Sequence, residues 1–508
     1  MTLRWLSARA ALAVLLLLVV PPAPAATGGA DPLAGFDAYV ARAVADWKVP
    51  GFAIAVVKDG KVAFAKGYGV RELGRPEQVD EHTVFAIGST TKAMTAALAG
   101  MLVDEGKLAW DDPVVKHLPS FQLRDPVATR EVTVRDLLTH RAGLGNADFL
   151  WYGQDSTTAQ ILERVPLLEP AYSLRSRFVY QNVMYAAAGR VIESVGGQSW
   201  PDMLRARIFE PLDMRDSVPL LSMVLPGANA ATPHYIVRGK VQVIDNMPVD
   251  GVAAAGSVWS SVHDMSKWMQ FLLDRGVVGG PGGRRLLSER TFAELFRPQA
   301  IVPDSQYPTT RLVMPHWMTY GLGWFQQDYQ GRAVDFHTGS IDGMVAIIGL
   351  IRSERLGVYA LGNLDHAELR HAAMYSVFDR YAGRSDRDWH AEVRALYVQL
   401  EQQSAAARKK TDSLRVPGTT PSLPIEQYAG VYSDPLRGEV AISADGGTLS
   451  IRHGRYSGAL EHWHFNTFRA RWKTEWHNGP LVAFIIGVSA MPEAIEVNGV
   501  RFARRRGT

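Results

Sequence analysis

The segment FAIGSTTKAMTAALAGMLVDEG, residues 85–106, places a serine three positions ahead of a lysine at the expected start of a helix. Apolar residues recur every three or four positions, and Gly106 is typical of a helix end. Residues three apart share one helix face, so the side chains of Ser89 and Lys92 can meet. The first turn also carries the positive end of the helix dipole, which favours an alkoxide or a nearby oxyanion.

Two interpretations of this pair are open. A buried lysine with a lowered pKa can accept the serine proton, which makes Ser89 a nucleophile and Lys92 its base. Alternatively, Ser89 caps the helix and Lys92 is solvated. Roughly one Ser-x-x-Lys pair is expected by chance in a chain of this length, so the pair needs support from elsewhere in the sequence.

The composition is that of a globular protein with one large domain and a small one, or about three domains. The 508 residues include 54 basic and 51 acidic side chains and carry a net charge of +3. This near balance gives no reason to expect a nucleic-acid partner. There is no cysteine, which excludes disulfides and a lipoprotein anchor.

The N-terminus has the pattern of a secretory signal peptide, residues 1–25. Arg4 and Arg9 precede an apolar run at 10–20, and Ala23-Pro24-Ala25 is a small-x-small cleavage site. The run is short for a bilayer span, so an uncleaved anchor is the less favoured alternative. We therefore expect a periplasmic or secreted protein without an integral membrane span after cleavage.

Residues 26–382 are predicted to form one domain with an α+β (mixed α/β) fold. A hairpin is expected at residues 51–69 around Asp59-Gly60, a strong turn dipeptide. Helical patterns follow at 134–139, 182–195, 200–209, 263–274 and 289–296. Strand patterns return at 320–329, 333–337, 344–351 and 357–362, ahead of a helix at 369–381. This order predicts an antiparallel sheet assembled from both ends of the region and flanked by helices.

The C-terminal part changes character. Residues 383–424 contain a polar amphipathic helix at 386–408 and a Pro-, Thr- and Ser-rich linker at 409–424. Short alternating strands separated by Gly, Asp and Asn turns then run through residues 425–508, which predicts a small all-β domain, a barrel or a sandwich. The linker is long enough for this domain to fold back over the preceding one.

A second candidate group is Tyr180 and Asn182, on either side of Gln181 and just ahead of a helical pattern. If the segment is extended, residues two apart point the same way, so a phenol and an amide face one cleft. The alternative is a core tyrosine followed by an asparagine helix cap.

The third candidate group lies in VDFHTGSIDGMVAIIGL, residues 334–350. A glycine within a strand lets another backbone approach closely, and a free strand edge can dock a ligand and supply an oxyanion donor. The alternative is a β-bulge with a structural histidine.

Together, Ser-x-x-Lys, Tyr-x-Asn and His-Thr-Gly in this order resemble the motifs of the serine β-lactamase and penicillin-binding-protein superfamily. The chain is most similar to class C β-lactamases and the related D-alanyl-D-alanine carboxypeptidases, esterases and D-aminopeptidases. Residues 132–144 and 254–271 also resemble segments of this superfamily, and the resemblance covers about residues 30–382. The C-terminal domain is similar to the small lipocalin-like β-barrel often appended to such hydrolases.

The resemblance implies a role for each candidate residue, without a metal or cofactor. Ser89 attacks an acyl carbon, while Lys92 and Tyr180 share the proton transfers, Tyr180 as a phenolate-like base held by Lys92. Asn182 holds Lys92 and the substrate amide. The backbone N–H groups of Ser89 and Ser340 form the oxyanion hole.

His337, Thr338, Gly339 and Ser340 are expected to bind the substrate, and His337 departs from the family pattern, which has lysine there. A neutral histidine anchors a substrate carboxylate less well than a permanent charge, which favours peptides, D-amino-acid amides or esters over β-lactams. His337 can still tune proton transfer or hydrogen-bond Tyr180.

The alternative functions of the protein are a true β-lactamase or penicillin-binding protein and, from another class, a non-catalytic sensor of cell-wall fragments. The oligomeric state is not predicted.

Overall fold

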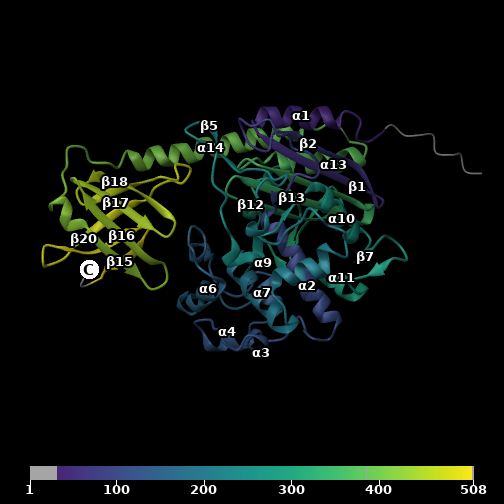
Figure 1. The fold of residues 1–508 in the computed structure, drawn as a ribbon, viewed down its shortest axis with the longest axis horizontal. Helices are drawn as coiled ribbons and strands as arrows, with labels where there is room; N and C mark the ends of the chain where they lie inside the picture. The colour runs from purple at the N-terminus through teal and green to yellow at the C-terminus, as the bar shows by residue number, and fades with distance from the viewer. Residues whose placement is uncertain (1–30, 385, 506–508) are drawn as a thin grey trace, which may run out of the picture.

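The computed structural model describes residues 31–384 and 386–505, so the predicted signal peptide lies outside it (Figure 1). The centre of the large domain is an eight-stranded sheet with the order β2-β1-β14-β13-β12-β11-β10-β9, in which neighbouring strands are antiparallel. The strands are β1 (Gly51–Lys58), β2 (Lys61–Gly69), β9 (Ala300–Ile301), β10 (Met318–Tyr320), β11 (Phe325–Tyr329), β12 (Arg332–Ile341), β13 (Met344–Ile351) and β14 (Leu356–Gly362).

The sheet combines both ends of the domain because β1 pairs with β14, about 300 residues later in the chain by the residue numbers. The β1–β2 turn is made by Asp59 and Gly60, both with positive φ (53° and 78°), the conformation that such a two-residue hairpin requires. Along β1, successive side chains alternate between two hydrophobic cores, which is why the strand is apolar throughout.

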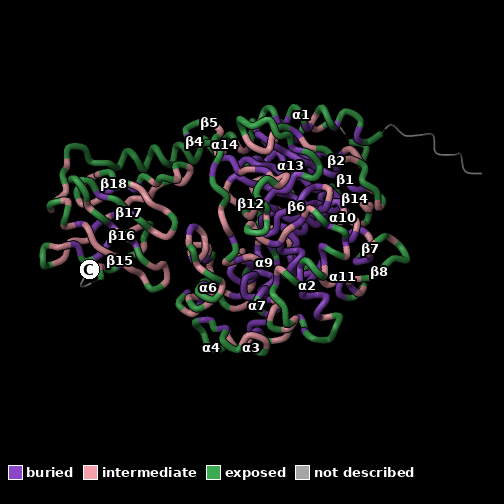
Figure 2. Tube along the Cα trace, viewed as in Figure 1, coloured by how far each residue is buried: buried purple, intermediate pink, exposed green. Residues whose placement is uncertain are grey.

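Helices cover both faces of the sheet, and Figure 2 shows the strands buried between them. One core contains α1 (Phe36–Trp47), α13 (Leu369–Tyr381) and the beginning of α14 (Trp389–Asp412). The other contains α2 (Thr91–Asp104) and α10 (Val262–Leu273). The result is a three-layer arrangement in which α2 reaches the sheet from a mostly helical region.

That helical region is built around α7 (Asn182–Gly196), which packs against α2. The remaining helices are α3 (Val114–His117), α4 (Pro126–Glu131), α5 (Val134–Leu138), α6 (Thr158–Arg164), α8 (Trp200–Leu204), α9 (Ala253–Gly256), α11 (Glu289–Leu295) and α12 (Thr310–Val313). Three small ribbons pair β3 (Phe85–Ala86) with β6 (Trp259–Ser260), β4 (His234–Val237) with β5 (Lys240–Val243), and β7 (Val277–Val278) with β8 (Arg284–Arg285).

The C-terminal domain is a closed eight-stranded barrel whose strands follow one another in chain order. Its strands are β15 (Gly430–Asp434), β16 (Gly438–Asp445), β17 (Thr448–His453), β18 (Tyr456–His464), β19 (Thr467–Trp472), β20 (Leu481–Ile486), β21 (Pro492–Val497) and β22 (Val500–Arg504). Helix α14 leads from the large domain to the barrel, and most of its length is exposed (Figures 1 and 2). The predicted fold class is therefore confirmed.

Some predicted boundaries are wrong. Helix α14 ends at Asp412 and so takes up the first residues of the predicted linker, because Lys409 and Lys410 continue the helix and the proline of the linker comes only at Pro417. The single strand pattern at 320–329 is two strands, because Gly323 turns the chain with a φ of 83°.

Among residues 31–384 and 386–505, no helix combines the length and apolar character that crossing a membrane requires.

Candidate active site

Ser89 lies in a 3₁₀ turn, Gly88–Thr90, that leads directly into α2. Lys92 is the second residue of α2, and its side chain is 0% exposed. Its Nζ lies 3.0 Å from Ser89 Oγ, while Ser89 itself is only half-buried. The solvated-lysine interpretation is therefore wrong, and the hydroxyl faces both the amine and the solvent side of the site.

Lys92 is held by two further acceptors. Its Nζ lies 2.8 Å from Asn182 Oδ1 and 2.9 Å from the Ala255 carbonyl oxygen. Burial lowers the pKa of Lys92 well below its usual value, and the Asp148 carboxylate raises it by a smaller effect. This environment favours a neutral amine, the form that can accept a proton.

Asn182 connects Lys92 to an acidic residue that the sequence analysis missed. Asn182 is the first residue of α7 and Gln181 occupies the cap position, so the helix-cap interpretation of Asn182 is wrong. Its Nδ2 donates to Asp148 Oδ1 at 2.9 Å, which fixes the amide so that its oxygen faces Lys92. No local spacing relates Asp148 to the three motifs.

Tyr180 packs directly beside this pair. The Lys92 Nζ lies 4.7 Å from the centre of the Tyr180 ring. Burial raises the pKa of Tyr180 well above its usual value, and the hydrogen bond with the Ser89 hydroxyl lowers it by a smaller effect. These directions favour a neutral phenol rather than the expected phenolate, so Lys92 is the better candidate for the base and Tyr180 for a group that passes a proton on.

His140 is a second residue that the sequence analysis did not single out, although it lies within the familial stretch 132–144. Its Nδ1 accepts from the Gln181 backbone N–H at 3.0 Å, and its ring centre lies 4.4 Å from that of Tyr180. Burial lowers its pKa well below the usual value, so the ring is neutral. His140 therefore fixes the backbone between Tyr180 and Asn182 without adding charge.

His337 is buried in β12 and does not hydrogen-bond Tyr180. Its Nδ1 lies 2.7 Å from the Thr338 carbonyl oxygen, so Nδ1 carries the hydrogen, and its Nε2 lies 3.1 Å from the Tyr320 hydroxyl. Burial, with a smaller effect of the Lys92 charge, lowers the pKa of His337 to about 3. His337 is thus neutral at ordinary pH. The next residue, Thr338, shares a hydrogen bond with the Tyr307 hydroxyl at 2.9 Å.

The backbones of β12 and the Ser89 turn touch each other. A Cβ added to Gly339 would lie 1.9 Å from the Ile87 carbonyl oxygen and 3.2 Å from the Ser89 nitrogen. A Cβ on Gly88 would lie 2.7 Å from the Ser340 nitrogen. Two glycines therefore permit close contact between β12 and the turn, and the backbone nitrogens of Ser89 and Ser340 both lie at this contact.

Comparisons with known proteins agree with this arrangement. The family model described as "Beta-lactamase" matches residues 36–380, more than half of the chain. The chain belongs to the beta-lactamase family. A second model, a domain of unknown function (DUF3471), matches residues 414–504 and so covers the barrel.

Among the relatives of this beta-lactamase family member is the unguisins hydrolase of Aspergillus violaceofuscus, 29% identical over 79% of this chain and 75% of that protein. Penicillin-binding protein 4 of Amycolatopsis lactamdurans is 30% identical over 60% of this chain and 78% of that protein. An octameric penicillin-binding protein homologue from Pyrococcus abyssi has a similar fold, with a TM-score of 0.62 at 23% identity over 92% of this chain and 99% of its own. A D-stereospecific amidohydrolase from Streptomyces has a TM-score of 0.56 at 23% identity, covering 68% of this chain and 98% of its own. The protein is a serine hydrolase of this family.

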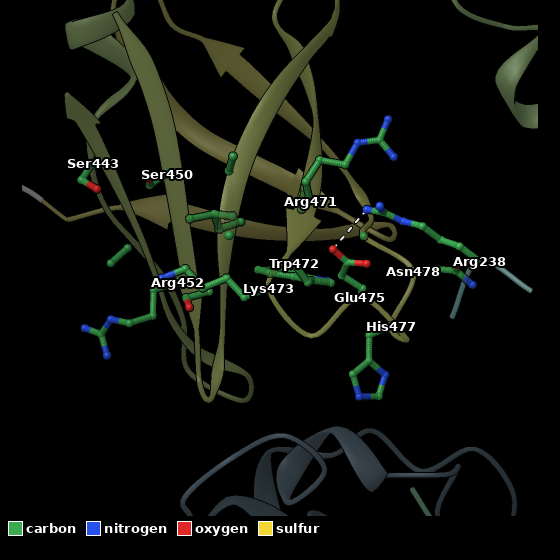
Figure 3. Close-up of a pocket in the computed structure, with 17 residues that line it drawn as sticks. Arg238, Ser443, Ser450, Arg452, Arg471, Trp472, Lys473, Glu475, His477 and Asn478 are labelled. Carbon is green, nitrogen blue, oxygen red and sulfur yellow. Dashed lines mark hydrogen bonds and ion pairs between the residues drawn. The ribbon is translucent and has the colours of Figure 1, made fainter. Parts of the chain in front are cut away.

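A separate groove of about 850 Å³ lies on the barrel (Figure 3). It is lined by residues of β16 to β19, by the 473–479 loop and by Arg238 of the large domain. Arg238 Nη2 lies 3.1 Å from Glu475 Oε1. None of the predicted site residues lines the groove.

Proposed function

We propose that the protein is an exported serine hydrolase that forms an acyl-enzyme at Ser89 and acts on peptides, D-amino-acid amides or esters. The observation that carries the proposal is the fully buried Lys92 amine, 3.0 Å from the half-buried Ser89 hydroxyl. A nucleophilic hydroxyl needs an adjacent base, and a desolvated lysine is one of the side chains that can serve.

The proposed reaction has two halves. In the first, Ser89 Oγ bonds to the acyl carbon as its proton passes to Lys92. The carbonyl oxygen meanwhile accepts hydrogen bonds from the Ser89 and Ser340 N–H groups. The bond from the acyl carbon to the amine or alcohol then breaks, and the leaving group takes the proton through Tyr180. In the second, water attacks the acyl carbon, gives its proton to the same base, and Ser89 leaves with its hydroxyl restored.

The neutral His337 supports the substrate class. A β-lactam carries a carboxylate that a permanent cation at this position would anchor, whereas the buried His337, with a pKa of about 3, carries no charge and has both ring nitrogens engaged by Thr338 and Tyr320. The name of the Streptomyces amidohydrolase also supports amide substrates, and that of the Aspergillus protein supports a hydrolase. Export is supported by the pattern of residues 1–25 alone.

The test is the Ser89→Ala variant of the purified protein. We expect it to lose labelling by a fluorophosphonate and hydrolysis of a p-nitrophenyl ester and of D-amino-acid amides. Ser404→Ala, on the exposed part of α14, is the matched control and should keep both activities. Unchanged labelling of Ser89→Ala would refute the nucleophile assignment.

Fluorescent penicillin distinguishes the alternatives on the same wild-type protein. Stable labelling indicates a transpeptidase-like site, rapid turnover indicates a β-lactamase, and neither result is expected for the proposed peptidase or esterase. Binding of cell-wall fragments without any burst of acylation would instead favour a non-catalytic sensor.

A further inference from the structure

Arg370 is a buried cation packed against the active-site end of β12 and the neighbouring strand β13. It is the second residue of α13 and is 4% exposed. Its Nη1 donates to the Gly339 carbonyl oxygen, to Ser340 Oγ at 3.1 Å and to the Ala346 carbonyl oxygen at 3.0 Å. The guanidinium therefore contacts both β12 and β13 at the level of the backbone nitrogens beside Ser89.

Burying the Arg370 guanidinium at the start of α13 costs free energy. A cation in the first turn of a helix opposes the helix dipole, and a buried charge must be compensated. Glu368 compensates it, with Oε2 3.0 Å from Arg370 Nε and Oε1 3.1 Å from Nη2. Burial raises the pKa of Glu368, but Arg370 and neighbouring histidines lower it well below the usual value, so the carboxylate is charged. This pairing leaves Nη1 for the strand.

The acceptor of Nη1 matters because of the planarity of the peptide bond. The Gly339 carbonyl and the Ser340 N–H belong to one peptide unit, and in a trans peptide they point in opposite directions. A charged donor on the carbonyl oxygen holds the plane of this unit, withdraws electron density and strengthens the N–H as a donor at the other end.

We propose that Arg370 is a positioning residue that orients and polarises the Gly339–Ser340 peptide, so that the Ser340 N–H stabilises the oxyanion formed from an ester or amide carbonyl at Ser89. This inference rests on the proposed function. The competing explanation is that Arg370 only fastens α13 to β12 and β13, in which case its loss lowers stability but leaves the reacting carbonyl unaffected.

The experiment compares Arg370→Met and Arg370→Lys with the wild type, using p-nitrophenyl ester kinetics and the infrared carbonyl stretch of the acyl-enzyme. We expect Arg370→Met to lower kcat about 10- to 100-fold with KM nearly unchanged, somewhat less than the loss from deleting a whole oxyanion donor. The acyl carbonyl should absorb at higher frequency, because a weaker donor polarises it less. Arg370→Lys retains a cation and should recover part of both effects.

Two further variants separate this role from folding. Glu368→Gln/Arg370→Met removes both charges, so no unpaired carboxylate is left buried, and it should show the same carbonyl shift. Arg352→Met is the matched control. Arg352 also pairs with a buried carboxylate, since its Nε lies 2.6 Å from Asp335 Oδ2, but Asp335 is at the other end of β12. We expect it to lose stability without a carbonyl shift.

The outcomes are distinguishable. A wild-type carbonyl frequency and kcat in both Arg370→Met and the double variant would overturn the proposal and leave Arg370 a structural residue. Retained labelling of Ser89→Ala would instead overturn the proposed function itself, whatever the Arg370 variants show.

Discussion

At the scale of single residues, the chemistry depends on how the charge of Lys92 is controlled. The amine is buried against Asn182 and the Ala255 carbonyl, which lowers its pKa, while the carboxylate of Asp148 raises it. Asp148 is reached through Asn182, because the Asn182 amide donates to one of its oxygens. The balance of these two effects sets the pH at which Ser89 acquires a neutral base.

Asp148→Asn tests this balance. The substitution keeps an oxygen that can accept from Asn182 and from Trp151 Nε1, since both donate to Oδ1, but it removes the charge. Removing a charge that raises the pKa of Lys92 lowers that pKa further, so the neutral amine persists to lower pH. We expect the acidic limb of the pH profile of kcat/KM to move to lower pH.

The measurement is the pH dependence of ester hydrolysis, with Asp412→Asn on α14 as a control that should leave the limb in place. A limb that moves to higher pH or stays unchanged would show that Asp148 does not control the base. His337 should contribute no limb near neutral pH, because its pKa of about 3 keeps it uncharged there.

At the scale of elements, the site is the contact between the Ser89 turn and the C-terminal part of β12, which extends beyond its pairing with β11. Gly339 is required because the Ile87 carbonyl occupies the space of a Cβ. The neighbouring atom is backbone, so it cannot move aside as a flexible side chain does.

Gly339→Ala should therefore displace β12 from the turn. We expect a loss of about 1–3 kcal/mol in the free energy of unfolding from overpacking. A displacement of about 1 Å at the reacting groups can cost about 100-fold in rate. Ester kinetics and thermal unfolding give the two readouts.

Gly357→Ala is the control on β14 of the same sheet. Its added Cβ would lie 3.0 Å from Met269 Sδ, at a flexible side chain, so hydrolysis should remain close to that of the wild type. Equal activity of the two alanine variants would argue against the tight contact between β12 and the turn.

At the scale of the whole molecule, the barrel contacts the large domain close to the site. Asp342, at the turn after β12, accepts from the Tyr152 hydroxyl and lies 3.0 Å from His477 Nε2 and 3.3 Å from Trp476 Nε1. In Figure 3, His477 points away from the barrel toward the large domain. A backbone hydrogen bond from Arg455 to Gly153 adds to this contact.

Both contacted segments lead directly to functional residues, since Asp342 is two positions after Ser340 and Tyr152 is four after Asp148. We therefore predict that Trp476→Ala/His477→Ala lowers kcat/KM by about 2- to 30-fold, the range that couplings of about 0.5–2 kcal/mol produce. Hydrogen exchange should increase in residues 148–155.

Arg469→Ala is the control in the barrel, because Arg469 Nη2 pairs with Asp412 of α14 at 2.7 Å, away from the large domain. Identical kinetics and exchange in the double variant and the control would mean that the barrel does not support the site. A chain ending near Gly383 then serves to ask whether the barrel contributes to oligomerisation.

The sequence by itself determined the elements and the spacing of the reactive pair. Periodicity indicated the long strands, several of the helices and an all-β C-terminal domain, and the i, i+3 relation on a helix brings Lys92 to Ser89 whatever surrounds them. Burial of the amine, the neutral state of His337 and the placements of Asp148 and Arg370 were decided by tertiary structure alone. The physical reason is that these depend on desolvation and on contacts between distant segments, which no local spacing encodes.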